Sequence, residues 1–168
     1  MQWRWARAHD SIDITGEGGA LATRKISSGV YRPAVCGEVL QAEGEAYAEF
    51  TWVSGGSPMV GVARAGVDPS SLAGGLHRTA DGWMYYCYGG EHYSGGRATP
   101  WATGKAQGIK VGETVGLLLK QGSLHVYIKG KQVGTMVTGL TGQLVWAADL
   151  HKQGASVRIA RKPPPPAQ

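Results

Sequence analysis

The chain has 168 residues and a net charge of +5, a length that suits one well-cored domain and is short for two. Its 27 glycines, 6 tryptophans and 7 tyrosines are typical of a sheet protein with many tight turns. The sequence contains no CxxC, CxxH or HxxxH spacing, which argues against a structural zinc site. No apolar run approaches the length of a membrane span.

Hydrophobic alternation and turn residues predict short strands along most of the chain and no amphipathic helix of three turns. Within the segment 47–53, Ala48, Phe50 and Trp52 share one face, which we expect to be buried. The predicted strand regions are residues 3–15, 20–25, 30–40, 47–53, 59–64, 83–88, 115–119, 124–128, 131–137, 144–150 and 155–159. Their number and regular turn spacing predict an all-β fold of two antiparallel sheets packed as a sandwich.

Three segments break the strand pattern. At Asp68 and Pro69, a capping residue followed by a helix-opening proline predicts a single helical turn. The polar, glycine-rich residues 89–108 are predicted to form a long irregular connection. Residues 161–168, RKPPPPAQ, are predicted to form a polyproline II tail. We therefore expect one sandwich domain over residues 1–160, followed by the tail.

The cysteines and the N-terminal residues bear on the compartment. Cys36 and Cys87 lie inside apolar or aromatic runs, and buried free thiols are favoured over a disulfide because small secreted domains usually carry more bridges. Residues 1–13 lack the apolar stretch of a secretory signal. A cytoplasmic or other reducing intracellular location is expected.

The charges are distributed unevenly along the chain. Residues 1–91 carry 7 Lys/Arg and 10 Asp/Glu, a net −3, whereas residues 92–168 carry 10 Lys/Arg and 2 Asp/Glu, a net +8. Scattered, solvated cations are the preferred interpretation. The alternative interpretation of the asymmetry is a basic face that binds an acidic partner surface.

Residues 111–137, VGETVGLLLKQGSLHVYIKGKQVGTMV, carry the most specific pattern. Two alternating strands and a third are separated by turns at Gln121-Gly122-Ser123 and Lys129-Gly130. This three-strand meander resembles the signature of the SPRY domain family. Five other segments resemble further motifs of that family, in the same order, and the resemblance covers nearly the whole chain. They are RWARAHDSIDITGEGGALATRK (4–25), GEAYAEFTW (44–52), VGVA (60–63), DGWMYY (81–86) and LVWAADL (144–150).

At four positions the sequence departs from the family pattern. Ala48 stands in place of a tryptophan, Lys120 of an aspartate, Lys129 of an asparagine and Trp146 of a proline. Lysine tolerates positive φ less well than asparagine, so the turn at Lys129 is expected to differ in type. The departures indicate a divergent member whose partner specificity does not carry over.

Catalytic interpretations are weaker than structural ones. Glu45 and Glu49 would lie roughly 13 Å apart on one strand, wider than either glycosidase mechanism needs. The five histidines are scattered, and neither a GxSxG elbow nor a GKS/T phosphate loop is present. Trp3 and Trp5 lie beside arginines in the sequence, so stacking of these rings on nucleic-acid bases is a minority interpretation. Packing of both rings in the core is preferred. We expect no catalytic residue, no metal site and no cofactor.

The resemblance implies a concanavalin-like jelly-roll sandwich that recognises a protein through loops gathered at one end. By position, those loops correspond to residues 24–26, 66–70 and 150–153, flanked by the loop that contains His92, Tyr93 and Arg97. Their cations favour an acidic or Asp/Asn-rich peptide or surface, bound by charge-assisted hydrogen bonds with apolar contact from Pro69 and Tyr93. The predicted partner-binding residues are Arg24, Lys25, Asp68, Pro69, Ser70, His92, Tyr93, His151 and Lys152.

The predicted function is a non-catalytic protein-interaction module, serving as an adaptor or a subunit of a larger assembly. Neither a membrane nor a nucleic acid is expected as a partner. The alternative is a lectin-like carbohydrate-binding sandwich, which the absence of asparagine and the presence of just five aspartates disfavour. A hydrolase is the third interpretation.

Overall fold

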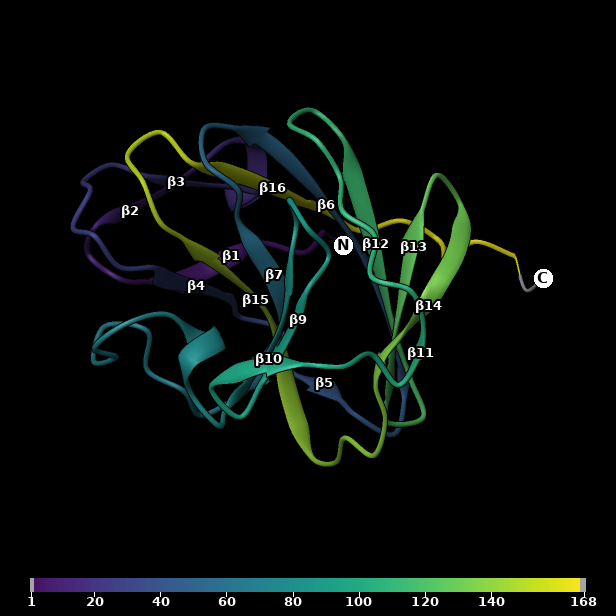
Figure 1. The fold of residues 1–168 in the computed structure, drawn as a ribbon. Coiled ribbons are helices and arrows are strands. Elements are labelled where there is room, and N and C mark those ends of the chain that lie inside the picture. Colours follow the sequence, from purple (N-terminus) through teal and green to yellow (C-terminus); the bar gives the residue numbers. More distant parts are fainter. Residues whose placement is uncertain (1, 167–168) are drawn as a thin grey trace.

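In the computed structural model, which describes residues 2–166, two antiparallel sheets of eight strands each pack face to face as a β-sandwich (Figure 1). Sheet A runs in the order β1 (Trp5–Ala8), β4 (Arg32–Cys36), β15 (Gln143–Leu150), β7 (Met59–Arg64), β8 (Gly82–Tyr86), β9 (His92–Ser94) and β10 (Arg97–Thr99), with β5 (Leu40–Gln41) also paired to β15. Sheet B runs in the order β11 (Thr103–Gly104), β14 (Lys131–Val137), β13 (Ser123–Ile128), β12 (Thr114–Lys120), β6 (Glu45–Ser54), β16 (Ser156–Ala160), β3 (Leu21–Arg24) and β2 (Ile12–Thr15).

The inner faces of the two sheets form one core, as alternation predicts. On β6 of sheet B, Ala48, Phe50 and Trp52 are buried. The Phe50 ring lies 5.8 Å edge-on from Trp146 of β15 in sheet A, so aromatic side chains join the two layers. Trp3 and Trp5 are buried in the same core, which confirms the packing interpretation and removes both rings from any stacking with bases.

The β12–β14 meander forms as predicted. Val115, Leu117 and Leu119 are fully buried in the core, and two-residue turns join the strands. Lys129 adopts φ 53° ahead of Gly130 at φ 77°, which is the left-handed pair of a type I′ hairpin turn. The expectation that this turn would differ in type is therefore wrong, because the glycine and the strand twist hold the lysine in the left-handed region.

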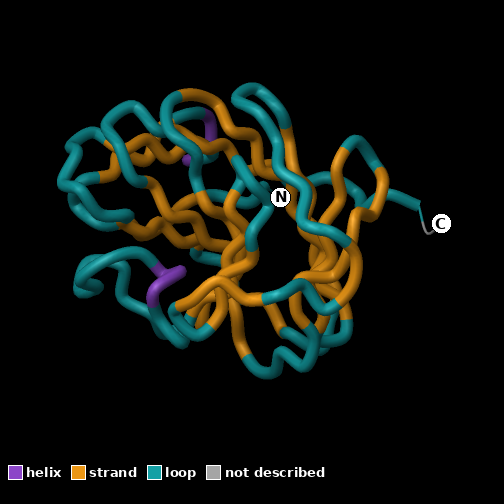
Figure 2. The backbone as a smooth tube through the Cα atoms, viewed as in Figure 1, coloured by secondary structure: helices purple, strands orange, loops and turns teal. Residues whose placement is uncertain are grey.

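Two predictions about irregular segments are also wrong. Residues 89–108 contain the β9–β10 hairpin, which extends sheet A, and β11, which pairs with β14. The predicted helical turn at Asp68 is an ordinary turn in which the Asp68 carboxylate accepts a hydrogen bond from the Ser70 N–H (3.0 Å). The described helical elements are three-residue 3₁₀ turns, η1 (Glu17–Gly19) and η2 (Leu76–Arg78) (Figure 2). Within residues 2–166, no helix has the length and apolarity needed to cross a membrane.

The segment after β16 leaves the sandwich beside the first core residues. The Arg161 guanidinium lies 4.3 Å above the ring centre of Trp3, and residues 161–166 form neither strand nor helix. The last two residues of the predicted tail, 167 and 168, lie outside the described residues, as does Met1.

Candidate functional site

Two loops meet at one end of the sandwich. The β3–β4 loop, residues 25–31, and the β15–β16 loop, residues 151–155, lie side by side (Figure 1). The Gln153 N–H donates to the Ser27 hydroxyl (2.7 Å), and the Gly154 N–H donates to the Arg24 carbonyl (2.8 Å). This contact brings predicted site residues from both ends of the sequence together.

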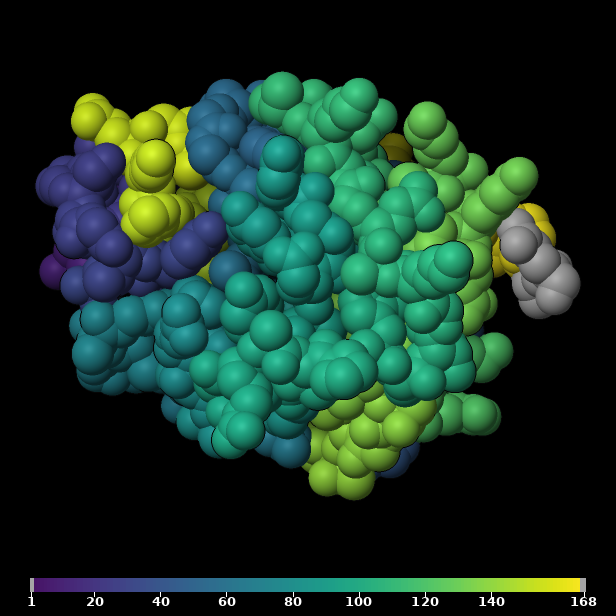
Figure 3. Space-filling view, in the orientation of Figure 1, coloured from purple at the N-terminus to yellow at the C-terminus, as the bar shows by residue number. Residues whose placement is uncertain are grey.

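A third segment, the β7–β8 connection (residues 65–81), folds across the outer face of sheet A. Its Val67 and Leu76 pack with Val35, Met84 and Val145 in an apolar cluster that is separate from the main core. In the space-filling view this connection, in dark teal, lies directly below the purple-blue loop 25–31 (Figure 3). The two segments therefore form one continuous surface.

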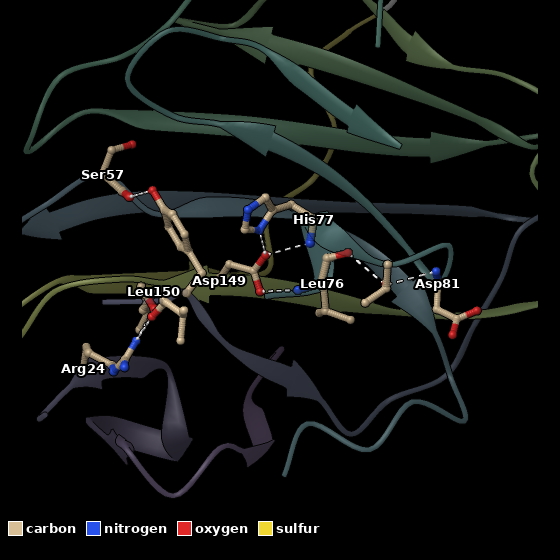
Figure 4. Close-up of polar contacts among 10 residues, drawn as sticks. Arg24, Ser57, Leu76, His77, Asp81, Asp149 and Leu150 are labelled. Atoms are coloured by element: carbon tan, nitrogen blue, oxygen red, sulfur yellow. Dashed lines mark hydrogen bonds and ion pairs between the residues drawn. The ribbon is translucent and has the colours of Figure 1, made fainter. Parts of the chain in front are cut away.

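A buried aspartate fixes the connection to the sheet. Asp149 is fully buried on β15, and its two carboxylate oxygens accept hydrogen bonds from the Leu76 N–H (2.9 Å) and the His77 N–H (3.0 Å) (Figure 4). The His77 ring adds a third contact, Nδ1 to Oδ2 at 2.9 Å. These contacts satisfy the carboxylate away from water and set the position of the η2 turn.

The chain passes so close to this aspartate that residue 75 has to be glycine. A Cβ on Gly75 would lie 2.7 Å from both Asp149 Oδ2 and His77 Nδ1, and 2.8 Å from the Tyr31 Cβ. Any side chain at position 75 would therefore push the connection off the sheet.

Aromatic rings gather above the aspartate. The Tyr31 ring stacks on His151 (4.7 Å between ring centres, 18° between planes) and meets His77 edge-on at 4.9 Å. Tyr93 also meets His77 edge-on, at 5.3 Å between ring centres. Burial raises the pKa of the Tyr31 phenol, and Tyr86 and Asp149 raise it further, so the hydroxyl stays protonated and can donate to the Ser57 carbonyl (3.4 Å).

The Tyr31, His77 and His151 rings border a pocket of about 280 Å³, here called the Tyr31 pocket. Its lining contains an arginine and two histidines and no carboxylate. The lining residues are Gly29, Val30, Tyr31, Gly74, Gly75, His77, Arg78 and His151.

Apolar side chains and cations surround the Tyr31 pocket. Ile26 and Val30 of the β3–β4 loop are 58% and 38% exposed. The nearby Tyr88, whose N–H is bonded to the Ser57 hydroxyl, is 70% exposed. Lys25 and Lys152 are exposed on the two adjoining loops. An apolar centre with a basic rim is the composition expected of a surface that contacts an acidic protein segment.

Three of the predicted contact residues are buried, and the structure corrects them. The Arg24 guanidinium donates to the carbonyls of Ile26 (2.6 Å), Val30 (2.9 Å) and Leu150 (2.6 Å). It also donates to the Ser28 hydroxyl (2.7 Å), so Arg24 holds the two loops together rather than facing a partner. Pro69 is a buried residue of the β7–β8 connection itself. His92 is 2% exposed on β9, and burial lowers its pKa, an effect that the Pro100 carbonyl partly offsets.

The remaining predicted residues fall into two groups. His151 lines the Tyr31 pocket, Tyr93 supports it through His77, and Lys25 and Lys152 lie on its flanking loops. Asp68 and Ser70 are exposed but belong to a different part of the β7–β8 connection. That part is tied to β1 by the Arg7 guanidinium, which donates to the Val67 carbonyl (2.9 Å).

Sequence reasoning missed Tyr31, His77, Arg78 and Asp149. One signal pointed to this group: Asp149 is a lone carboxylate inside the apolar run LVWAADL. A charge at such a position needs hydrogen-bonding partners from elsewhere in the chain. The spacing along the sequence does not reveal that His77, 72 positions earlier, is that partner.

The His77–Asp149 pair also bears on catalysis, since such pairs orient a histidine as a base. Among residues 2–166, no serine or cysteine side chain hydrogen-bonds to the His77 ring, and no group of three His, Cys, Asp or Glu side chains is placed to hold a metal ion. Glu45 lies 3.8 Å from the Lys120 ammonium, whereas Glu49 accepts a hydrogen bond from the Tyr47 hydroxyl. Each therefore has a structural partner.

No protein-family model matches this sequence, and no curated protein matches it. Solved structures do resemble it. The SPRY domain of human HERC1 superposes with a TM-score of 0.75 at 17% identity, over 95% of this chain and 97% of that one. The TRIM65 PSpry domain superposes with a TM-score of 0.72 at 15% identity, over 96% of this chain and 90% of that one. A human SPRY domain superposes with a TM-score of 0.70 at 18% identity, over 90% of this chain and 95% of that one.

The chain therefore has the SPRY-domain fold over about 95% of its length. The sequence resemblance noted above is confirmed at the level of the fold.

Proposed function

We propose that this chain is a non-catalytic protein-interaction module that binds an acidic or Asp/Asn-rich segment of another protein at the Tyr31 pocket. The Tyr31 pocket itself is the observation that carries the proposal: stacked rings and exposed apolar side chains are bordered by cations, and no carboxylate lines it. The fold is consistent with this role, because SPRY domains are generally protein-interaction modules.

In this proposal each part of the surface has a distinct task. The Tyr31 and His151 rings give apolar contact at low entropic cost, since few of their torsions remain free. Arg78, Lys25 and Lys152 bind carboxylates or side-chain amides through charge-assisted hydrogen bonds. Arg24 and Asp149 are buried and do not contact the partner; they hold the surrounding loops in one arrangement.

The test is selection of a random 12-residue peptide library on the purified protein, with a Lys25→Glu, Lys152→Glu double variant in parallel. We expect enrichment of acidic or amide-rich peptides, and at least tenfold weaker binding of the selected peptides to the double variant. The matched control is a Lys105→Glu, Lys131→Glu variant, which makes the same charge change at exposed positions outside these loops. Circular dichroism checks that each variant is folded.

A second variant separates ring contact from charge. Replacing His151 by alanine removes the ring stacked on Tyr31 and is expected to weaken the same peptides about tenfold, by removing a central contact. Selected peptides that bind the wild type and both variants equally would overturn the proposal. Glycan binding without any peptide enrichment would favour the lectin-like alternative instead.

We also propose that the protein works in a reducing compartment. Cys36 and Cys87 are free and buried, and burial raises the pKa of both thiols. The proposal is supported by a sandwich whose core is closed without a disulfide.

A further inference from the structure

A second pocket lies on the outer face of sheet B, and it shares no lining residue with the Tyr31 pocket. Its centre is Gly116 on β12, which pairs with Glu49 of β6 on one side and with Tyr127 of β13 on the other. A glycine in the middle of this row leaves a depression between two large side chains. A Cβ at position 116 would overlap the Tyr47 hydroxyl, so the Tyr47 side chain can lie across this position because the residue is glycine.

Two tyrosines form the walls of this pocket of about 340 Å³, here called the Tyr47 pocket. Tyr47 and Tyr127 are 6% and 7% exposed, and their rings meet edge to face at 6.1 Å and 87°. With Leu118 they make a small apolar cluster of their own on the outer face. The walls are therefore held in place before any ligand arrives.

Two carboxylates also line the Tyr47 pocket, each held through one oxygen. Glu49 Oε2 accepts a hydrogen bond from the Tyr47 hydroxyl (3.0 Å), and Glu113 Oε1 accepts one from the Lys110 N–H (2.7 Å). Lys129 is the single cation among the lining residues. The charge of the lining is negative, opposite to that of the Tyr31 pocket with its arginine and two histidines.

We propose that the Tyr47 pocket binds the cationic side chain of a lysine or arginine from a partner protein. Aromatic faces attract cations through their quadrupole, and carboxylates bind ammonium and guanidinium groups through charge-assisted hydrogen bonds. The volume accommodates one extended basic side chain, and the pre-set tyrosines limit the ordering cost of binding. This site lies on another face and does not depend on the function proposed for the Tyr31 pocket.

The test is a titration of the ¹⁵N-labelled protein, followed by NMR, with Nα-acetyl-arginine amide and Nα-acetyl-lysine amide. Nα-acetyl-norleucine amide serves as the uncharged probe. We expect saturable shifts of the amides of Tyr47, Glu49, Gly116 and Tyr127 with the two cationic probes and none with norleucine. A Glu49→Gln variant is expected to weaken binding about fivefold, as loss of one charge-assisted contact predicts.

The matched control is Glu45→Gln, which removes a carboxylate from the same strand outside the Tyr47 pocket and is expected to leave the affinity unchanged. A Gly116→Ala variant displaces the Tyr47 ring that forms one wall of the pocket and is expected to abolish the shifts. If the Gly116→Ala variant misfolds, the affinities of Glu49→Gln and Glu45→Gln for the cationic probes still test the proposal. Three results would overturn the proposal. These are equal amide shifts with the norleucine probe, equal affinities of the Glu49→Gln and Glu45→Gln variants, and amide shifts near every carboxylate of the protein instead of at the Tyr47 pocket.

Discussion

The β12–β14 meander and the β7–β8 connection are both held on a sheet, but by different kinds of interaction. The meander is fixed by backbone ladders, buried alternating side chains and two left-handed turn pairs. The connection spans residues 65–81 with one 3₁₀ turn, and side-chain-to-backbone hydrogen bonds tie it down. The first arrangement is distributed over many local contacts. The second is concentrated in a few long-range ones.

This difference determines where single substitutions should act. In a ladder, each residue contributes a small part, and neighbouring pairs remain when one is lost. In the connection, Asp149 alone satisfies two buried backbone N–H groups and the His77 ring. Removing a group with several buried partners exposes the full desolvation cost of each partner.

The largest effect is expected from Asp149→Ala. It leaves the Leu76 and His77 N–H groups buried without an acceptor, and should lower the free energy of unfolding by about 3–5 kcal/mol. Urea denaturation measures the loss. The control is Asp81→Ala, an exposed aspartate at the end of the same connection, for which a change within about 0.5 kcal/mol is expected. A loss below about 1 kcal/mol for Asp149→Ala would mean that apolar packing, rather than this carboxylate, holds the connection.

A smaller effect is expected from Arg24→Met. The Leu150 carbonyl is buried and loses its donor, whereas Ile26 and Val30 lie in an exposed loop where water can replace the guanidinium. The expected loss is about 2–3 kcal/mol, with faster amide hydrogen exchange in residues 25–31 and 151–155 than in the meander. Arg158→Met changes an exposed arginine on β16 and serves as the control. Unchanged exchange in both loops would remove Arg24 from its proposed role in holding them.

The same contrast explains which features could be predicted from the sequence. The meander and the buried face of β6 were predictable because alternation and turn residues are local signals. The β9–β10 hairpin was missed because its strands have three residues each, too few to show a period. Arg24 was mistaken for a surface cation because its carbonyl partners include Leu150, 126 positions away. Tyr31 and His77 were missed for the same reason, since the fold alone brings them beside Asp149.

The smallest effect, and the one of opposite sign, is expected in the meander. Lys129 occupies a left-handed position at φ 53°, which is less costly for asparagine, whose short side chain can bond to the local backbone. Lys129→Asn should therefore raise the free energy of unfolding by about 0.5–1 kcal/mol, seen as a higher urea midpoint at constant slope. Lys129→Ala removes the same charge without favouring the left-handed region, so it should not stabilise. If both variants stabilise the protein equally, the gain comes from removing the Lys129 charge. The left-handed conformation of residue 129 would then not be the source of strain in this turn.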